Sequence, residues 1–155
     1  MPTYFSNLGD AYLYQDKSDS ALYFYQDALA IDTKYQDIEG LAYSNLSLGN
    51  LYAEYEEYSK AEAYLASALD QAKQIGDRAL EVSILNAMAR VLLAQNVIDW
   101  GLNVASESYE LAMDINFPEG IRDALKVESA LLEKAKKYRE ALNKIQLYYQ
   151  YVNRI

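Results

Sequence analysis

The sequence of 155 residues contains no cysteine and no histidine. The thiolate nucleophile, the most common general base and the usual zinc ligands are therefore missing. The six glycines are scattered along the chain, so no glycine-rich loop is present to hold a phosphate. These absences predict a protein that is not an enzyme and that uses no metal and no cofactor.

Basic residues are also scarce: 14 Lys and Arg stand against 23 Asp and Glu, and the formal net charge is −9. Such a charge repels a nucleic-acid backbone and an anionic membrane surface. No apolar run approaches the roughly 20 residues that span a bilayer, and residues 1–3 lack the basic start of a secretory signal. We therefore expect this domain to bind neither nucleic acid nor membrane, and to be cytoplasmic.

Hydrophobic side chains make up 52% of the sequence, and sixteen residues are Tyr. Because these residues run through the whole chain, it can bury a core and is not expected to be disordered. The length suits one domain, residues 1–155. Composition thus favours a folded, acidic binding or scaffolding protein.

The chain repeats itself every forty residues without a gap. Residues 8–12, 48–52, 88–92 and 128–132 align with one another. A second block keeps the same phase, with Ala21, Ala61, Gly101 and Ala141 at equivalent positions. Four repeats follow, at about 1–40, 41–80, 81–120 and 121–155.

Each repeat has the apolar spacing of two helices. Leu41, Asn45, Leu48 and Tyr52 recur at three and four residues, and β-branched alternation is absent. Short polar breaks separate the helices at 15–17, 35–37, 56–57, 75–77, 116–118 and 136–137. Second helices are expected to start at Ser18, Ser59 and Asp99. The sequence predicts an all-α protein of eight helices in four antiparallel pairs.

Small residues recur inside these helices, where glycine costs about 1 kcal/mol relative to alanine. Gly9, Gly49 and Gly101 therefore indicate places where two helix backbones approach closely. Large neighbours such as Tyr12 and Tyr52 would fill the space beside them.

This pattern of small and large residues resembles the tetratricopeptide repeat. The residues that carry the resemblance in the first two repeats are Leu8, Gly9, Tyr12, Ala21, Tyr25 and Ala28, then Leu48, Gly49, Tyr52, Ala61, Leu65 and Ala68. The third repeat is weaker, and the fourth departs at Glu128 and Ser129. The forty-residue period is similar to the variant found in kinesin light chains and in bacterial sensor and transcription regulators. The resemblance implies a right-handed α-solenoid whose first helices line a concave groove that binds a protein or an extended peptide without catalysis.

Candidate groove residues follow from the first helices of the repeats. Those selected for hydrogen bonding, charge or an aromatic surface are Asn7, Asp10, Tyr14, Tyr43, Asn50, Asn86, Arg90 and Lys126. An Asn amide both donates and accepts, so it can pair with a peptide backbone, while Arg90 and Lys126 can hold a carboxylate. The alternative interpretation is that these polar side chains simply solvate an exposed face.

Chaperone-binding members of the family hold a C-terminal carboxylate with basic and amide side chains. The matching positions here are Ser6, Asp10, Ser47, Ser83 and Ala87, and none of them is basic. The sequence therefore argues against binding of a chaperone tail.

Two further features favour association through the last repeat. Residues 121–155 carry eight basic and four acidic residues, whereas the three preceding repeats are acidic. The last predicted helix has an apolar face formed by Ala141, Leu142, Ile145, Tyr148, Tyr149, Val152 and Ile155. A self-associating scaffold is therefore the alternative to peptide binding. We also expect that the chain is a fragment of a longer protein, such as the sensory part of a bacterial regulator.

Overall fold

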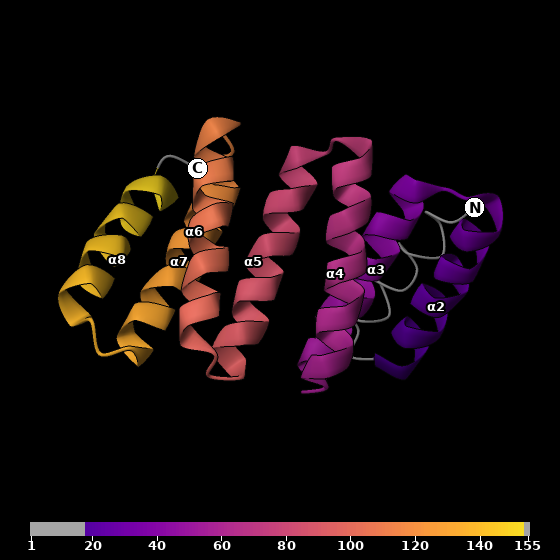
Figure 1. The fold of residues 1–155 in the computed structure, drawn as a ribbon, viewed down its shortest axis with the longest axis horizontal. Coiled ribbons are helices and arrows are strands. Elements are labelled where there is room, and N and C mark those ends of the chain that lie inside the picture. Colours follow the sequence, from indigo (N-terminus) through magenta and orange to yellow (C-terminus); the bar gives the residue numbers. More distant parts are fainter. Residues whose placement is uncertain (1–17, 154–155) are drawn as a thin grey trace. The chain divides into compact units, whose positions relative to one another are not determined.

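A computed structural model describes residues 18–153, and all regular structure in that range is helical (Figure 1). The helices are α2 (Ser18–Tyr35), α3 (Ile38–Glu54), α4 (Tyr58–Ile75), α5 (Arg78–Ala94), α6 (Ile98–Asp114), α7 (Pro118–Lys134) and α8 (Tyr138–Val152). The predicted all-α class is confirmed, and the breaks expected from residue 35 onward fall between helices. The first predicted helix lies outside the described residues.

The described part of the chain forms two compact halves, residues 18–76 and 77–153, and the point in the sequence that divides them is a predicted repeat boundary. In the N-terminal half, α3 packs against both α2 and α4. In the C-terminal half, α6 packs against α5 and α7, while α7 also packs against α5 and α8. The expectation of one continuous domain stays a prediction.

The turns between the helices share a common backbone conformation. Each contains a residue with positive φ: Gln36, Glu56, Gly76, Asn96, Asn116 or Lys136, with φ between 54° and 70°. In the turns other than the one at Gly76, the next residue donates its backbone N–H to a carbonyl five residues earlier, as Glu57 does to Tyr52 at 2.9 Å. This is the Schellman arrangement, which satisfies carbonyls at the end of a helix.

Side chains cap two of the first helices. Asp37 accepts a hydrogen bond from the backbone N–H of Gly40, and Asp77 accepts one from Leu80, both at 3.0 Å. Pro118 begins α7, where the N–H that proline lacks would have no partner within the helix. The expected starts at Ser59 and Asp99 are wrong by one residue, because α4 begins at Tyr58 and α6 at Ile98 and neither has a side-chain cap.

Gly49 and Gly101 lie at close contacts, as expected, but the atoms nearest to them belong to leucine side chains and not to the tyrosines or the second helix backbone that the sequence predicted. A Cβ atom added to Gly49 would lie 2.7 Å from Leu65, and one added to Gly101 would lie 2.8 Å from Leu131. Such distances are too short for a side chain, so each glycine lets a neighbouring leucine approach the helix backbone. Gly9 lies outside the described residues.

The departure of the fourth repeat at Glu128 has a structural explanation. Glu128 occupies the position of Leu48 and is 9% exposed, and its carboxylate lies 3.4 Å from Lys144 on α8. The Lys144 ammonium also lies 5.4 Å from the centre of the Tyr109 ring. Burial raises the pKa of Glu128, and Lys144 opposes that shift. An ionic contact therefore replaces an apolar one where α8 packs on α7.

Candidate functional site

The candidate site lies between α5 and α7, the first helices of the third and fourth repeats. Gly120 brings the start of α7 close to α5, because a Cβ at this position would lie 2.6 Å from Val82. Asn86 on α5 donates its side-chain N–H to the Gly120 carbonyl at 3.2 Å. The same amide accepts a hydrogen bond from Ser108 on α6 at 2.6 Å. These contacts hold α5, α6 and α7 together beside the site.

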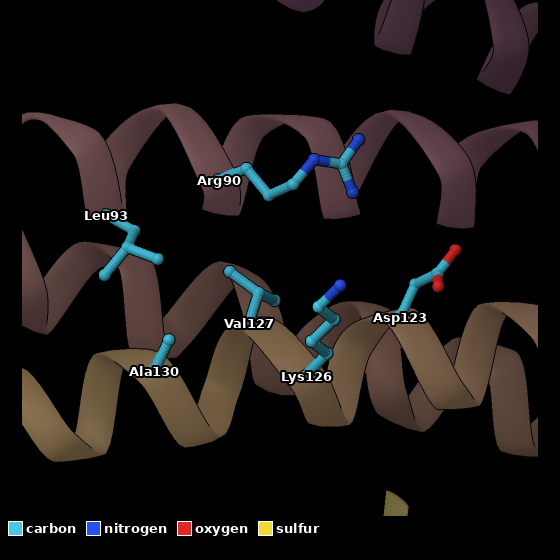
Figure 2. Close-up of a pocket in the computed structure, with 6 residues that line it drawn as sticks. All are labelled: Arg90, Leu93, Asp123, Lys126, Val127 and Ala130. Carbon is cyan, nitrogen blue, oxygen red and sulfur yellow. The ribbon is translucent and has the colours of Figure 1, made fainter. Parts of the chain in front are cut away.

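Side chains from α5 and α7 line a pocket of about 240 Å³. The lining residues are Arg90 and Leu93 on α5, with Asp123, Lys126, Val127 and Ala130 on α7. Figure 2 shows the charged groups toward one end of the pocket and the apolar side chains of Leu93 and Ala130 toward the other. The pocket can therefore receive a charged group and an apolar group side by side.

Positive charge predominates at the charged end. The carboxylate of Asp123 accepts a hydrogen bond from Arg122 at 3.1 Å. Within residues 18–153, neither Arg90 nor Lys126 has a carboxylate within ion-pair distance. Partial burial lowers the pKa of Arg90, and the charge of Asp123 opposes this. Because an arginine guanidinium stays charged at neutral pH, two cations are available to an incoming anion.

A second hollow of about 480 Å³ continues from the apolar end. It shares Leu93 and Ala130 with the first pocket and is also lined by Glu133, Lys134, Lys136 and Tyr138. Lys126 and Lys134 are eight residues apart on α7, which corresponds to about 12 Å along the helix. We call the two hollows together the α5/α7 groove; it has lysines at both ends and an apolar middle.

The structure brings together only some of the predicted site residues. Arg90 and Lys126 line the same pocket. Tyr43 and Asn50 are exposed on α3 in the other half, two turns apart. Asn7, Asp10 and Tyr14 lie outside the described residues.

The placement of Asn86 corrects the prediction that its side chain faces a groove. This residue is only 2% exposed, and its amide is occupied by Gly120 and Ser108. Asn86 therefore positions the groove helices, and its buried amide is not presented to the groove.

Leu93 is a groove residue that the sequence did not reveal. It follows Arg90 by three residues, so the two lie on one helix face. In the sequence, Leu93 cannot be distinguished from a leucine of the core. The packing of α5 against α7 places it in the pocket.

Metal binding and membrane insertion are two other possible functions for residues 18–153. No group of three or more acidic residues in 18–153 is arranged to hold a metal ion. Within the same range, every helix is too short or too polar to cross a membrane.

The fold matches that in the crystal structure of BtubC (BKLC) from P. vanneervenii with a TM-score of 0.89 at 16% sequence identity. The match covers 98% of this chain and 63% of the other, so the chain spans less than two thirds of the length of that protein. No protein-family model and no curated protein matches the sequence. The match supports a helical-repeat fold, and the tetratricopeptide assignment remains a resemblance.

Proposed function

We propose that this chain is a non-catalytic protein-interaction module whose α5/α7 groove binds an extended, acidic segment of another protein. The observation that carries the proposal is the pocket in which Arg90 and Lys126 stand beside Leu93, Val127 and Ala130. A carboxylate would accept charge-assisted hydrogen bonds from the two cations. A neighbouring apolar side chain would bury itself against the leucine, valine and alanine.

The dimensions of the groove favour a short linear segment. An extended chain advances by about 3.3 Å per residue, so about four residues cover the distance of roughly 12 Å between the lysines. A helical-repeat fold of this kind presents such a surface without needing any catalytic group. The further expectation that the module belongs to a larger regulatory protein is part of the same proposal.

The proposal is tested by selecting peptides from a random displayed library on the wild-type chain, with counter-selection on the double variant Arg90→Gln/Lys126→Gln. Selected peptides should contain Asp or Glu next to an apolar residue. Because a hydrogen bond to a charged group contributes about 1.5–3 kcal/mol, each single variant should weaken binding about tenfold or more. Fluorescence anisotropy of labelled peptides measures the affinities.

Lys137→Gln is the matched control, because Lys137 is exposed and lines neither hollow of the groove. It removes the same charge and should leave the affinity unchanged within about twofold. Equal losses in Lys126→Gln and Lys137→Gln would show a general charge effect. That result, or selected peptides without acidic residues, would contradict the proposed site.

A further inference from the structure

Helix α8 exposes an apolar stripe on the side that faces away from its own core. The exposed fractions are 63% for Tyr138, 55% for Leu142, 59% for Tyr149 and 36% for Val152. Ile145 lies between them and is half-buried. The spacing alternates four and three residues, which is the pattern of a seam between two helices. We call these five residues the α8 stripe.

Equivalent positions on α6 show what such a stripe normally meets. Forty residues earlier, Ile98, Leu102 and Tyr109 are half-buried and Ala112 is 0% exposed. Helix α7 packs on α6, and Ala112 and Tyr109 lie in one cluster with Ile121 and Leu125 of α7. On α8, by contrast, residues such as Tyr148 and Tyr151 pack toward that core, while the stripe has no helix over it in the described structure.

We propose that the α8 stripe binds the same stripe of a second copy of this chain, with the two α8 helices antiparallel. The outer residues of the stripe are symmetric about Ile145, because Tyr138 and Val152 lie seven residues on either side of it. The inner residues are nearly so, because Leu142 lies three residues before Ile145 and Tyr149 four residues after it. A two-fold axis at Ile145 therefore sets Tyr138 against Val152 of the second copy, and Leu142 against its Tyr149 with an offset of about 1.5 Å along the helix. Each large aromatic ring meets an aliphatic side chain, which suits packing across a two-fold interface.

The charges near α8 favour the antiparallel arrangement. Lys136, Lys137 and Arg139 cluster at the start of the helix. Antiparallel pairing separates the two clusters by about 20 Å, the length of α8, and this exceeds the screening length of about 8 Å at physiological salt. Each cluster also approaches the C-terminal end of the other α8, where helix dipoles favour positive charge. Parallel pairing would place the two clusters together.

The size of the stripe sets the strength of the dimer. Two tyrosines and their aliphatic neighbours would bury roughly 400 Å² per copy, or about 800 Å² in total, whereas stable interfaces bury about 1,200–2,000 Å². The dimer is therefore weak, and the monomer should predominate at low micromolar concentration.

Sedimentation velocity over a concentration series tests the surface. The wild-type sedimentation coefficient should rise from the monomer value toward that of a dimer, and Tyr149→Glu should lower the association constant at least tenfold. The matched control is Gln150→Glu, which adds the same charge at the adjacent exposed position outside the stripe. A wild-type monomer at every concentration, or equal effects of the two variants, would overturn the proposal. Tyr149 lines neither hollow of the α5/α7 groove, so peptide binding should survive in Tyr149→Glu.

Cross-linking tests the orientation, because the natural chain has no cysteine. A mixture of the Tyr138→Cys and Val152→Cys variants, treated with a short bifunctional maleimide, should give the mixed dimer faster than either variant alone gives its own dimer. Asn143→Cys, exposed on α8 outside the stripe, is the control and should give only background. Faster formation of the Tyr138→Cys homodimer would show parallel pairing and would overturn the antiparallel interface.

Discussion

At the scale of single residues, the groove depends on polar side chains that are themselves buried. Asn86 and Ser108 occupy positions that hold Leu46 and Ala68 one repeat earlier. Their hydrogen bond of 2.6 Å, together with the bond from Asn86 to Gly120, ties the three helices around the groove. A buried polar group without a partner lowers the free energy of unfolding by more than a hydrogen-bonded pair raises it. The contribution of this pair to stability is therefore measured by changing both residues together.

Ser108→Ala should lower the free energy of unfolding by about 1–3 kcal/mol, because it leaves the buried side-chain oxygen of Asn86 without its donor. Asn86→Ala should lower it by a similar amount through the loss of two hydrogen bonds, although the Ser108 hydroxyl still donates to the Val82 carbonyl at 3.3 Å. The double variant Asn86→Leu/Ser108→Ala, which copies the preceding repeat, should lose less than the sum of these two. Urea unfolding followed by circular dichroism measures the changes. Asn50→Ala is the exposed control and should stay within about 0.5 kcal/mol of wild type. Additive losses in the double variant would show that the two side chains act separately.

Asp32 is a second buried polar residue, in the N-terminal half. It is 0% exposed, and its carboxylate accepts one hydrogen bond from Ser44 at 3.2 Å. The other carboxylate oxygen finds no hydrogen-bond partner among the described residues. Burial raises the pKa of Asp32, and the Ser44 hydrogen bond only partly opposes this.

A carboxyl group whose pKa is raised by folding contributes its full stability below the pKa of the unfolded chain, about 3.9, and loses it as the pH rises through the folded value. Asp32→Asn should therefore raise the urea midpoint at pH 7 and leave it nearly unchanged near pH 4. Asp70→Asn, exposed on α4, is the control and should show a much smaller pH-dependent difference. An equal shift of the Asp32→Asn midpoint at both pH values would contradict the buried-charge explanation.

At the scale of the elements, the sequence predicted nearly every helix end that the structure describes. The forty-residue period and the breaks at 35–37, 56–57, 75–77, 116–118 and 136–137 indicate these boundaries. What could not be predicted was which way a polar residue on a first helix points. The register of Asn86 on the first helix predicts that it faces the groove. Ser108, which replaces the alanine of the preceding repeat, instead donates a hydrogen bond to the Asn86 amide and holds it in the interior. The only indication in the sequence is that Leu46 and Ala68 of the second repeat are both replaced by polar residues, Asn86 and Ser108, in the third.

The turns allow an element-scale prediction about backbone strain. Glu56 adopts φ 61°, a left-handed conformation that costs a side chain about 1–2 kcal/mol. Glu56→Gly should therefore stabilise the N-terminal half by about 0.5 kcal/mol, after the entropy that glycine gains in the unfolded chain is subtracted. Gly76→Ala should destabilise by about 0.5 kcal/mol through the same balance of backbone strain and unfolded-state entropy, because an added Cβ meets nothing within 4 Å and introduces no clash. Thermal unfolding measures both, and the same sign of change in the two variants would contradict this interpretation of the turns.

At the scale of the whole molecule, the distribution of charge matters more than the net charge of −9. Three basic residues of the last repeat, Lys126, Lys134 and Lys136, line a groove that also receives Arg90 from an otherwise acidic repeat. An overall acidic chain thus has a locally basic groove, which is the basis for proposing an acidic partner. The sequence predicted Arg90 and Lys126 as groove residues, but only the pairing of α5 with α7 supplied Leu93 and the continuous apolar middle.

The most direct test of the central claim is chemical-shift mapping of the ¹⁵N-labelled chain with a selected acidic peptide. We expect the shifts to concentrate at Arg90, Leu93, Lys126, Val127 and Ala130, and to disappear in the Arg90→Gln/Lys126→Gln variant. Shifts confined to the α8 stripe or to α3, with α5 and α7 unperturbed by a peptide that binds, would contradict the assignment of the groove.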